Sequence, residues 1–372
     1  MGTAYTPGLT VSPHTTIHRT RRLPLKGEVA VKVGDAVNPE TIIARAALPG
    51  IMQSVKVAGQ LGIDPDELDG TLKIKIGDSV VKDQVLAETK AFFGFFKSEA
   101  KSPVSGTVET ISTATGSVGI RQAPTPIELS AYISGRVSEI IEGEGAVVET
   151  DGALVQGIFG VGGERVGVVH VVSASVNDIL TPDVITPDLA GKLIVGGGGI
   201  TGDGLRKASQ VGVAGVIAGG IIDKDLIAFL GYDIGVAITG HENINITVVV
   251  TEGFGMIPMA ARTFELLKSL EGQTGSINGA TQIRAGVIRP EVIVPHAITS
   301  MKAAATETFE LVVGVPIRVI REPYFGILGN VTKLPPELTV IDSGATVRVL
   351  EAKLADGRTV TVPRANVEIV AG

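Results

Sequence analysis

The chain has 372 residues, of which 44% are hydrophobic and 19% charged, and its formal net charge is −7. This length allows roughly two to four domains with cores of their own, and the hydrophobic fraction excludes a disordered chain. The negative balance excludes a global basic field for nucleic acid, and the lack of cysteine excludes disulfides, thiolate catalysis and cysteine-ligated metal centres.

Residues 1–22 contain two histidines and three arginines but no apolar segment, so the sequence predicts no signal peptide. We expect them to form a flexible N-terminal arm. No apolar run approaches the roughly 18 residues that a membrane-spanning helix needs. The interpretation is a cytoplasmic protein without a membrane span.

A repeat occupies the first third of the chain. Residues 27–37 (GEVAVKVGDAV) return 43 residues later as residues 70–80 (GTLKIKIGDSV). Each copy alternates apolar and polar residues, reaches a Gly-Asp turn and leads into a second apolar strand, at residues 41–44 or 84–87. Because glycine adopts a positive φ easily, the repeat predicts two turns of one kind between short strands.

Residues 70–121 resemble a barrel-sandwich hybrid of the biotinyl/lipoyl type, in the unmodified form that occurs in the Rnf-type electron-transport complex. The residues that carry the resemblance are Gly77, Asp78, Val80, Ser102, Pro103, Gly106 and Val108. With the first copy of the repeat, the resemblance extends over residues 23–121. It implies a lipoyl-like β module over residues 23–135.

A carrier domain of this kind holds its cofactor on a lysine at a tight hairpin tip, and Lys90 lies near that place. The apolar segment that follows is too long for such a tip, and no Met-Lys or Asp-Lys pair is present, so we expect neither lipoyl nor biotin on Lys90. Four phenylalanines in that segment either fold over the barrel or contact a protein partner. They are Phe92, Phe93, Phe95 and Phe96.

The middle of the chain alternates strands and helices. Residues 136–181 continue the β pattern and either close the first barrel or add a second one. After Pro182 and Pro187, the expected strands are residues 192–195, 213–217 and 244–250, and the expected helices are residues 203–211, 223–230 and 257–271. This order favours a mostly parallel sheet in an α/β domain over residues 182–295.

The motif Gly197-x-Gly199-x-x-Gly202 has the spacing of a dinucleotide-binding turn between a strand and a helix. Asp223 stands 21 residues past the last glycine, near the position of a ribose-binding acid. Free backbone amides at a helix N-terminus suit a phosphate, so one interpretation is nucleotide or phosphate binding at residues 196–202. The other is close packing of the helix against the strand. Glu252, after a third strand, either contacts that ligand or caps the next helix.

No set of side chains points to a reaction. The sequence lacks a Gly-x-Ser-x-Gly elbow, a His-Glu-x-x-His helix and a lysine in the glycine-rich loop of the kind that binds nucleotide phosphates. His14 and His18 are four residues apart, but Pro13 argues against the helix that would bring them together. We therefore expect no catalytic residues and no metal site, and no cofactor apart from the nucleotide or phosphate considered for residues 196–202.

Residues 311–372 follow a linker expected at residues 296–310. They alternate apolar and polar residues in short strands around glycine turns, which predicts a small, strongly bent β-barrel. They resemble the KOW-containing SH3-like barrels of the NusG transcription-elongation factor and of certain ribosomal proteins. The residues that carry this resemblance are Val315, Ile317, Val319, Pro323, Gly326, Gly329, Val331, Pro363 and residues 367–370.

Charge limits what the C-terminal barrel can bind. With seven Lys or Arg and six Asp or Glu, it carries a net charge of +1, which is weak for phosphate-driven binding of RNA or DNA. A local partner contact is expected at the barrel's arginines and aromatic residues. These are Arg318, Arg321, Tyr324 and Phe325.

The fold class expected is therefore a multidomain protein, β-rich with a central α/β sheet. Three functions remain open. The favoured one is a non-catalytic scaffold or adaptor that binds protein partners or associates with itself through β modules. The others are a nucleotide-binding or redox-linked enzyme component that uses residues 196–202, and a KOW factor associated with RNA or transcription.

Overall fold

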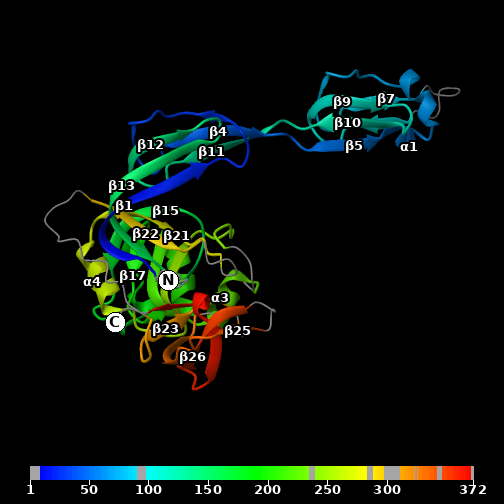
Figure 1. The fold of residues 1–372 in the computed structure, drawn as a ribbon. Helices are drawn as coiled ribbons and strands as arrows, with labels where there is room; N and C mark the ends of the chain where they lie inside the picture. The colour runs from blue at the N-terminus through cyan, green and yellow to red at the C-terminus, as the bar shows by residue number, and fades with distance from the viewer. Residues whose placement is uncertain are drawn as a thin grey trace.

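The computed structural model describes residues 9–89, 98–233, 239–282, 288–296, 311–321, 323–324, 326–341 and 346–369. The described residues form a β-rich fold, as expected, with five sheets. Figure 1 shows a distal β module (residues 49–122) that stands away from the rest of the protein, a proximal β module (residues 23–48 and 123–148), an α/β body (residues 149–296) and a C-terminal sheet (residues 311–369).

The distal β module consists of a four-stranded sheet, a hairpin and two short helical segments. Its elements are β5 (Met52–Lys56), α1 (Val57–Leu61), η1 (Pro65–Gly70), β6 (Ser79–Val80), β7 (Val85–Glu88), β8 (Glu99–Lys101), β9 (Gly106–Ser112) and β10 (Ser117–Arg121). The sheet has the order β5-β10-β9-β6, and β7 pairs with β8. A core of its own, which includes Leu68, Leu86 and Ile120, fills the module.

The proximal β module has the corresponding strands. They are β2 (Glu28–Val29), β3 (Ala36–Val37), β4 (Ile42–Leu48), β11 (Thr125–Ser130), β12 (Gly135–Ile141) and the first part of β13 (Gly145–Gln156). Strand β1 (Val11–Arg22) pairs with β13 along its length, from Val11 opposite Val155 to Arg22 opposite Gly145. The expectation of a flexible arm is therefore wrong for residues 11–22, because a long antiparallel ladder holds them.

The two β modules repeat each other at their glycine turns. Gly34 has a φ of +93° and Gly77 a φ of +96°, a region that suits glycine. The N–H of Gly34 donates to the carbonyl of Val137, and the N–H of Gly77 donates to the carbonyl of Val108, both at 2.8 Å. The repeat in the sequence therefore corresponds to a repeat in three dimensions.

The aspartates of the two turns also act alike. Asp35 Oδ2 accepts a hydrogen bond from the N–H of Lys32, and Asp78 Oδ2 accepts one from the N–H of Lys75, both at 2.8 Å. A carboxylate that closes its own turn in this way favours the turn over an extended chain.

The repeat includes the hairpin that follows. Strand β4 pairs with β11 through Ile42–Ser130, Ala44–Leu129 and Arg45–Glu128, and β7 pairs with β8 through Val85–Lys101, Ala87–Ala100 and Glu88–Glu99. Both ladders have a register shift after the first of these pairs. The two modules therefore share one topology.

The distal β module is inserted into the proximal one. The chain leaves β4 at Leu48 and returns at Thr125, and these two residues face each other at the end of the β4–β11 ladder. The whole distal module thus lies at the tip of that hairpin (Figure 1). Residues 90–97 lie outside the described residues, and so do the expectations for Lys90 and for Phe92, Phe93, Phe95 and Phe96.

The α/β body is built on the largest sheet. Its strands are β14 (Phe159–Val161), β15 (Arg165–Val171), β16 (Ile179–Leu180), β17 (Leu193–Val195), β18 (Gly199–Ile200), β19 (Gly215–Ile221), β20 (Thr247–Phe254), β21 (Thr274–Asn278) and β22 (Glu291–Pro295). The helical segments are η2 (Pro182–Val184), η3 (Pro187–Leu189), α2 (Gly202–Val211), α3 (Asp223–Leu230) and α4 (Ala261–Ser269).

Six of these strands run parallel, in agreement with the sequence pattern: β15, β17, β19 and β20, with β16 and β18 beside them. The sheet continues from β15 through β21 and β22 to β13, and β14 lies at the other end, beside β20. Only Gly157 and Ile158 separate β13 from β14, so the sheet curls until its two sides meet. Because β14 and β15 pair with the parallel strands, the sheet crosses the expected boundary between residues 136–181 and 182–295.

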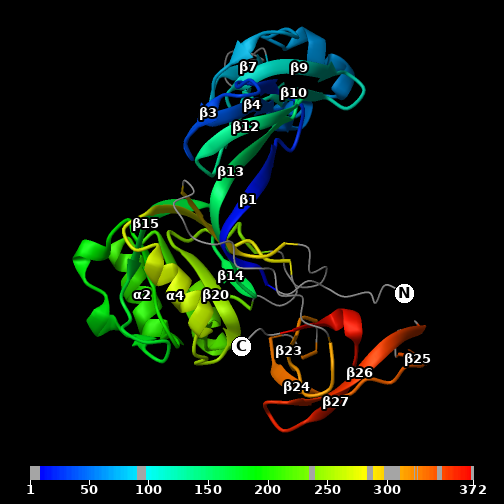
Figure 2. The same cartoon turned by 60° about the vertical axis from the view of Figure 1, so that its left-hand side comes forward.

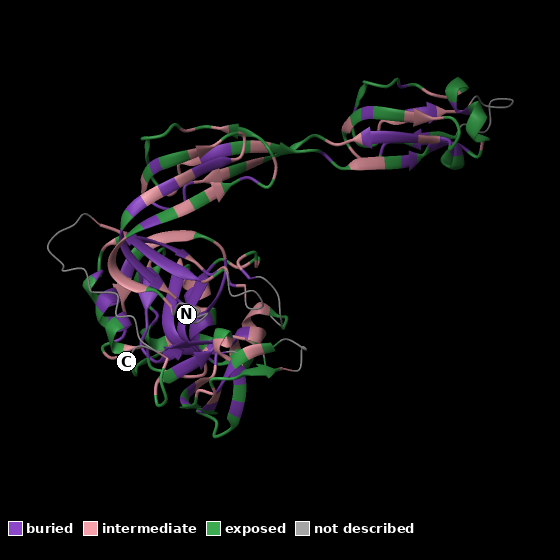
Figure 3. Cartoon of the chain, viewed as in Figure 1, coloured by how far each residue is buried: buried purple, intermediate pink, exposed green. Residues whose placement is uncertain are grey.

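Helices cover both faces of the curled sheet. Leu205 of α2 and Leu226 of α3 share one core with Val216 and Val248, and Phe264 of α4 belongs to a second core. Figure 2 shows α2 and α4 against the sheet, and Figure 3 shows how burial concentrates in its strands.

Several expected element ends need correction. Strands β19 and β20 run through their glycines to Ile221 and Phe254, because their ladder continues beyond a register shift. The helix expected at residues 257–271 is shorter, since Ala260 is not yet helical and α4 begins at Ala261. Helices α2 and α3 end at Val211 and Leu230, each before a glycine, as predicted.

The C-terminal sheet contains β23 (Pro316–Val319), β24 (Leu328–Lys333), β25 (Leu338–Val340), β26 (Thr346–Leu354), β27 (Thr359–Pro363) and β28 (Val367–Ile369), with η4 (Arg364–Asn366) before the last strand. The order is β25-β26-β24-β23-β28, and β27 pairs with β26. The last strand thus returns to the first. Residues 297–310, most of the expected linker, lie outside the described residues.

Candidate functional site

The glycine-rich loop is buried, and its N–H groups have partners within the chain. Gly197 donates to Ser173 Oγ at 3.1 Å, and Gly198 donates to the carbonyl of Asp178 at 2.7 Å. Gly202 donates to Asp225 Oδ2 at 3.0 Å. These three N–H groups, which a phosphate would use in a dinucleotide-binding turn, are therefore engaged in this conformation.

Packing accounts for the glycines of this loop. A Cβ atom on Gly197 would lie 2.1 Å from the carbonyl oxygen of Ser175, and one on Gly199 would lie 2.8 Å from that of Gly220. Asp223 is exposed in the first turn of α3, while Asp225, which the sequence did not single out, reaches the loop. The structure thus supports close packing here, and nucleotide binding stays a prediction.

The arginines and aromatic residues expected to form a partner contact on the C-terminal sheet are not gathered on one exposed face. Arg318 is only 2% exposed. Tyr324 is half-buried, and the guanidinium of Arg358 lies 5.1 Å from its ring centroid. Arg321 is also half-buried, and Phe325 lies outside the described residues. Arg318 instead faces the α/β body.

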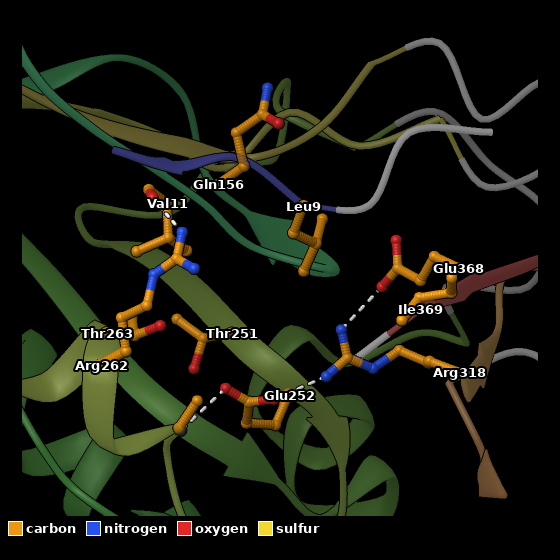
Figure 4. A pocket seen from close by; sticks show the side chains of 11 residues that line it. Leu9, Val11, Gln156, Thr251, Glu252, Arg262, Thr263, Arg318, Glu368 and Ile369 are labelled. Carbon is orange, nitrogen blue, oxygen red and sulfur yellow. Dashed lines mark hydrogen bonds and ion pairs between the residues drawn. The ribbon is translucent and has the colours of Figure 1, made fainter. Parts of the chain in front are cut away.

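A chain of four charged residues, which we call the charged junction, joins the C-terminal sheet to the α/β body. Figure 4 shows Glu252, Arg318 and Glu368 of this chain. Arg318 Nη2 donates to Glu252 Oε2 at 2.6 Å, and Arg318 Nη1 donates to Glu368 Oε1 at 2.8 Å. Arg289 Nη2 donates to Glu368 Oε2 at 3.2 Å. Two positive and two negative charges therefore alternate and cancel.

Each member of the charged junction is positioned by its strand. Glu252 lies near the end of β20, and its Oε1 accepts a hydrogen bond from the N–H of Ala260 at 3.0 Å, so it caps α4 as one interpretation of the sequence had it. Arg318 and Glu368 are direct partners across the β23–β28 ladder. Arg289 lies just before β22.

The charged junction is withdrawn from solvent. The side chains of Arg318, Glu368 and Glu252 are 3%, 1% and 9% exposed. Burial lowers the pKa of Arg289, and the attraction of Glu368 opposes that shift. Arg318 Nε is buried without a partner among the described residues. Buried charges cost free energy unless they are paired, and each charged group of this junction has a partner of opposite charge.

A cleft of about 80 Å³ adjoins the charged junction. Its lining also includes Leu9, Gln156, Thr251, Arg262 and Thr263, whose side chains Figure 4 shows around it. Ligand sites for drug-sized molecules are on the order of 300–1,000 Å³. The cleft therefore has room for a few water molecules or a small ion, and a nucleotide exceeds it.

Apolar side chains are exposed on the β modules. In the distal β module, Ile51, Ile76 and Val81 are 70%, 64% and 63% exposed. In the proximal β module, Val33 holds the position of the repeat that corresponds to Ile76, and it is 63% exposed. Both residues directly precede the turn glycine. These aliphatic side chains are thus open to contact with another protein.

The comparisons with known proteins assign the chain to no family. No family model matches the chain, and no curated protein matches it. Within the described ranges, no group of three or more His, Cys, Asp or Glu side chains is arranged to hold a metal ion. None of the helices in those ranges combines the length and apolar character needed to cross a membrane.

Proposed function

We propose that this protein is a non-catalytic scaffold or adaptor, and that its distal β module binds protein partners, further copies of the chain among them. One observation carries the proposal. The distal module stands clear of the rest of the molecule at a hairpin tip (Figure 1) and exposes Ile51, Ile76 and Val81. A module held away in this manner offers its surface to a partner without steric hindrance from the body.

The remaining parts suit a supporting role. The charged junction ties the C-terminal sheet to the α/β body, and β1 and β13 tie the body to the proximal β module. In this proposal the two β modules are barrel-sandwich hybrids, which their shared turns and hairpins support. The C-terminal sheet is an SH3-like barrel, which the return of β28 to β23 supports.

The test removes the distal β module and leaves the rest intact. Because Leu48 and Thr125 face each other across the ladder, a two-residue turn of the Asn-Gly type can join them in place of residues 49–124. We expect this variant to keep the thermal unfolding midpoint of the remaining protein. For the full chain, we expect light scattering to detect self-association, or cross-linking in the source cells to join other proteins to it. We expect the variant to lose that association.

A matched pair of triple variants tests the apolar side chains. I51N/I76N/V81N should abolish the same association, whereas K56Q/D66N/K82Q changes three exposed polar residues of the same module and should leave it unchanged. If the full chain is a monomer at all concentrations and its cross-links do not depend on these apolar residues, the proposal fails.

A further inference from the structure

A second cavity, of about 490 Å³, lies between the proximal β module and the α/β body. Its volume falls within the range of small-molecule sites. The proximal β module contributes Glu40, Ser130 and Tyr132, and the body contributes Glu164, Arg165 and Ala214. The cavity is therefore shared by two parts of the chain that are far apart in sequence.

Arg165 supplies a positive charge to this cavity that no carboxylate of the described residues neutralises. Its Nη2 donates to the carbonyl of Ile244 at 2.6 Å, and its Nε is buried without a partner among the described residues. Burial lowers the pKa of Arg165. The side chain of Arg165 lines the cavity, so the oxygen of an anionic ligand can accept a charge-assisted hydrogen bond from its guanidinium group.

The other charged residues of the cavity divide into a paired and an unpaired group. Arg21 donates to both carboxylate oxygens of Glu164, at 2.6 and 2.7 Å, and its guanidinium lies 5.4 Å from the ring centroid of Tyr132. Glu164 is thereby neutralised. Glu40, on the proximal side, is exposed and forms no ion pair with any described residue.

We propose that this cavity binds a small zwitterion, of which a free amino acid is the simplest example. The carboxylate of the ligand would pair with Arg165 and its ammonium group with Glu40. One unneutralised positive charge and one unneutralised negative charge line the same cavity, which matches the two charges of such a ligand. A phosphate would meet the repulsion of Glu40, and a polyamine would meet that of Arg165. The proposal does not depend on the scaffold function, since it concerns a different surface.

Occupation of the cavity would also affect the arrangement of the protein. The ligand would bridge Glu40 of the proximal β module and Arg165 of the body, and would therefore favour one orientation of the two parts. The charged junction lies elsewhere, between the body and the C-terminal sheet, so it would remain as it is.

Isothermal titration calorimetry of the full chain tests the proposal. The probes are the twenty L-amino acids, with acetate, methylammonium and inorganic phosphate as ligands that carry one kind of charge. We expect at least one amino acid to bind with a stoichiometry of about one, and more tightly than any singly charged probe. R165Q and E40Q should each weaken that binding about tenfold or more, the loss expected for one charge-assisted hydrogen bond.

R136Q is the matched control, because Arg136 is exposed on β12 and does not line the cavity. It should bind as the wild type does. If R165Q does not fold, E40Q decides, since Glu40 is exposed. The proposal is overturned if no amino acid binds, if E40Q binds the amino acids as tightly as the wild type, or if inorganic phosphate binds more tightly than they do.

Discussion

Replacing Arg318 with methionine should separate the C-terminal sheet from the α/β body. Arg318 donates to Glu252 and to Glu368 at 2.6 and 2.8 Å, with 3% of its side chain exposed. Methionine occupies a similar volume but has no hydrogen-bond donor and no charge. The substitution therefore leaves the buried carboxylate of Glu252 without a positively charged partner, and leaves Glu368 with Arg289 alone.

The magnitude follows from burial. Removal of one partner of a buried ion pair typically costs about 3–5 kcal/mol, because the remaining charge stays out of water. Glu252 retains the N–H of Ala260 and Glu368 retains Arg289, which places R318M at the lower end, at about 3 kcal/mol. In the double variant R318M/E252Q one uncompensated charge is gone, so we expect a coupling energy of roughly 1–3 kcal/mol.

Urea unfolding followed by circular dichroism measures these changes, since the chain has no tryptophan to report by fluorescence. R348M is the matched control, because Arg348 is exposed on β26 of the same sheet. It should change the free energy of unfolding by less than about 0.5 kcal/mol. Hydrogen exchange should also become faster in β23 and β28 of R318M and stay unchanged in R348M.

Two results would refute this reasoning. In one, R318M is no less stable than R348M, which would mean that the charged junction contributes nothing net. In the other, the double variant shows no coupling, which would mean that Arg318 and Glu252 do not interact in solution.

Two further predictions concern the glycine-rich loop. G197A should lower the thermal unfolding midpoint strongly, because its Cβ would lie 2.1 Å from the carbonyl oxygen of Ser175, whereas G70A, with no atom within 4 Å of its Cβ, is the control; equal midpoints would show that packing does not require Gly197. The hydrogen bonds from Ser175 lower the pKa of Asp178 below 3.8. A carboxylate whose pKa is lower in the folded state than in the unfolded state stabilises the fold at pH values above its ordinary pKa. That contribution is lost as the pH falls through the lowered pKa, so the wild type should lose stability below about pH 4. D178N should lose less over the same range in thermal melts, and an identical pH dependence would contradict this assignment.

Much of the local structure could be predicted because its signals are local. Thr201 caps α2 by accepting from the N–H of Gly204 at 3.0 Å, and Gly212 and Gly231 end α2 and α3 with φ of +84° and +82°. The repeated Gly-Asp turns were also visible in the sequence, because each carboxylate closes its own turn.

Pairings between distant segments could not be predicted. The ladder between β1 and β13 joins residues more than a hundred positions apart, and nothing in residues 11–22 specifies that partner. The insertion of the distal β module likewise depends on a pairing between distant segments, that of β4 with β11, so the sequence shows the repeat but does not show the insertion.

The candidate site shows the same limit. The alternation in β23 places Ile317 and Val319 in the core of the C-terminal sheet and Arg318 on its other face, where the sequence predicts a partner contact. It does face outward, but the surface it meets is the α/β body of its own chain. The partnership of Arg318 with Glu368 depends on the register of β23 and β28, which the sequence alone does not give.

The nested insertion has a consequence for the order in which the chain acquires its structure. During synthesis, β4 is made before the strands of the distal β module, and β11 is made after them. In the distal β module, the N–H of Gln122 donates to the carbonyl of Ile51 at 3.1 Å, so the two ends of the module are held together once the module has folded. A loop of seventy-odd residues between Leu48 and Thr125 then becomes a short effective one, and the entropy lost on closing the outer hairpin falls. A folded distal β module thereby makes it easier for β4 and β11, the strands on either side of it, to pair.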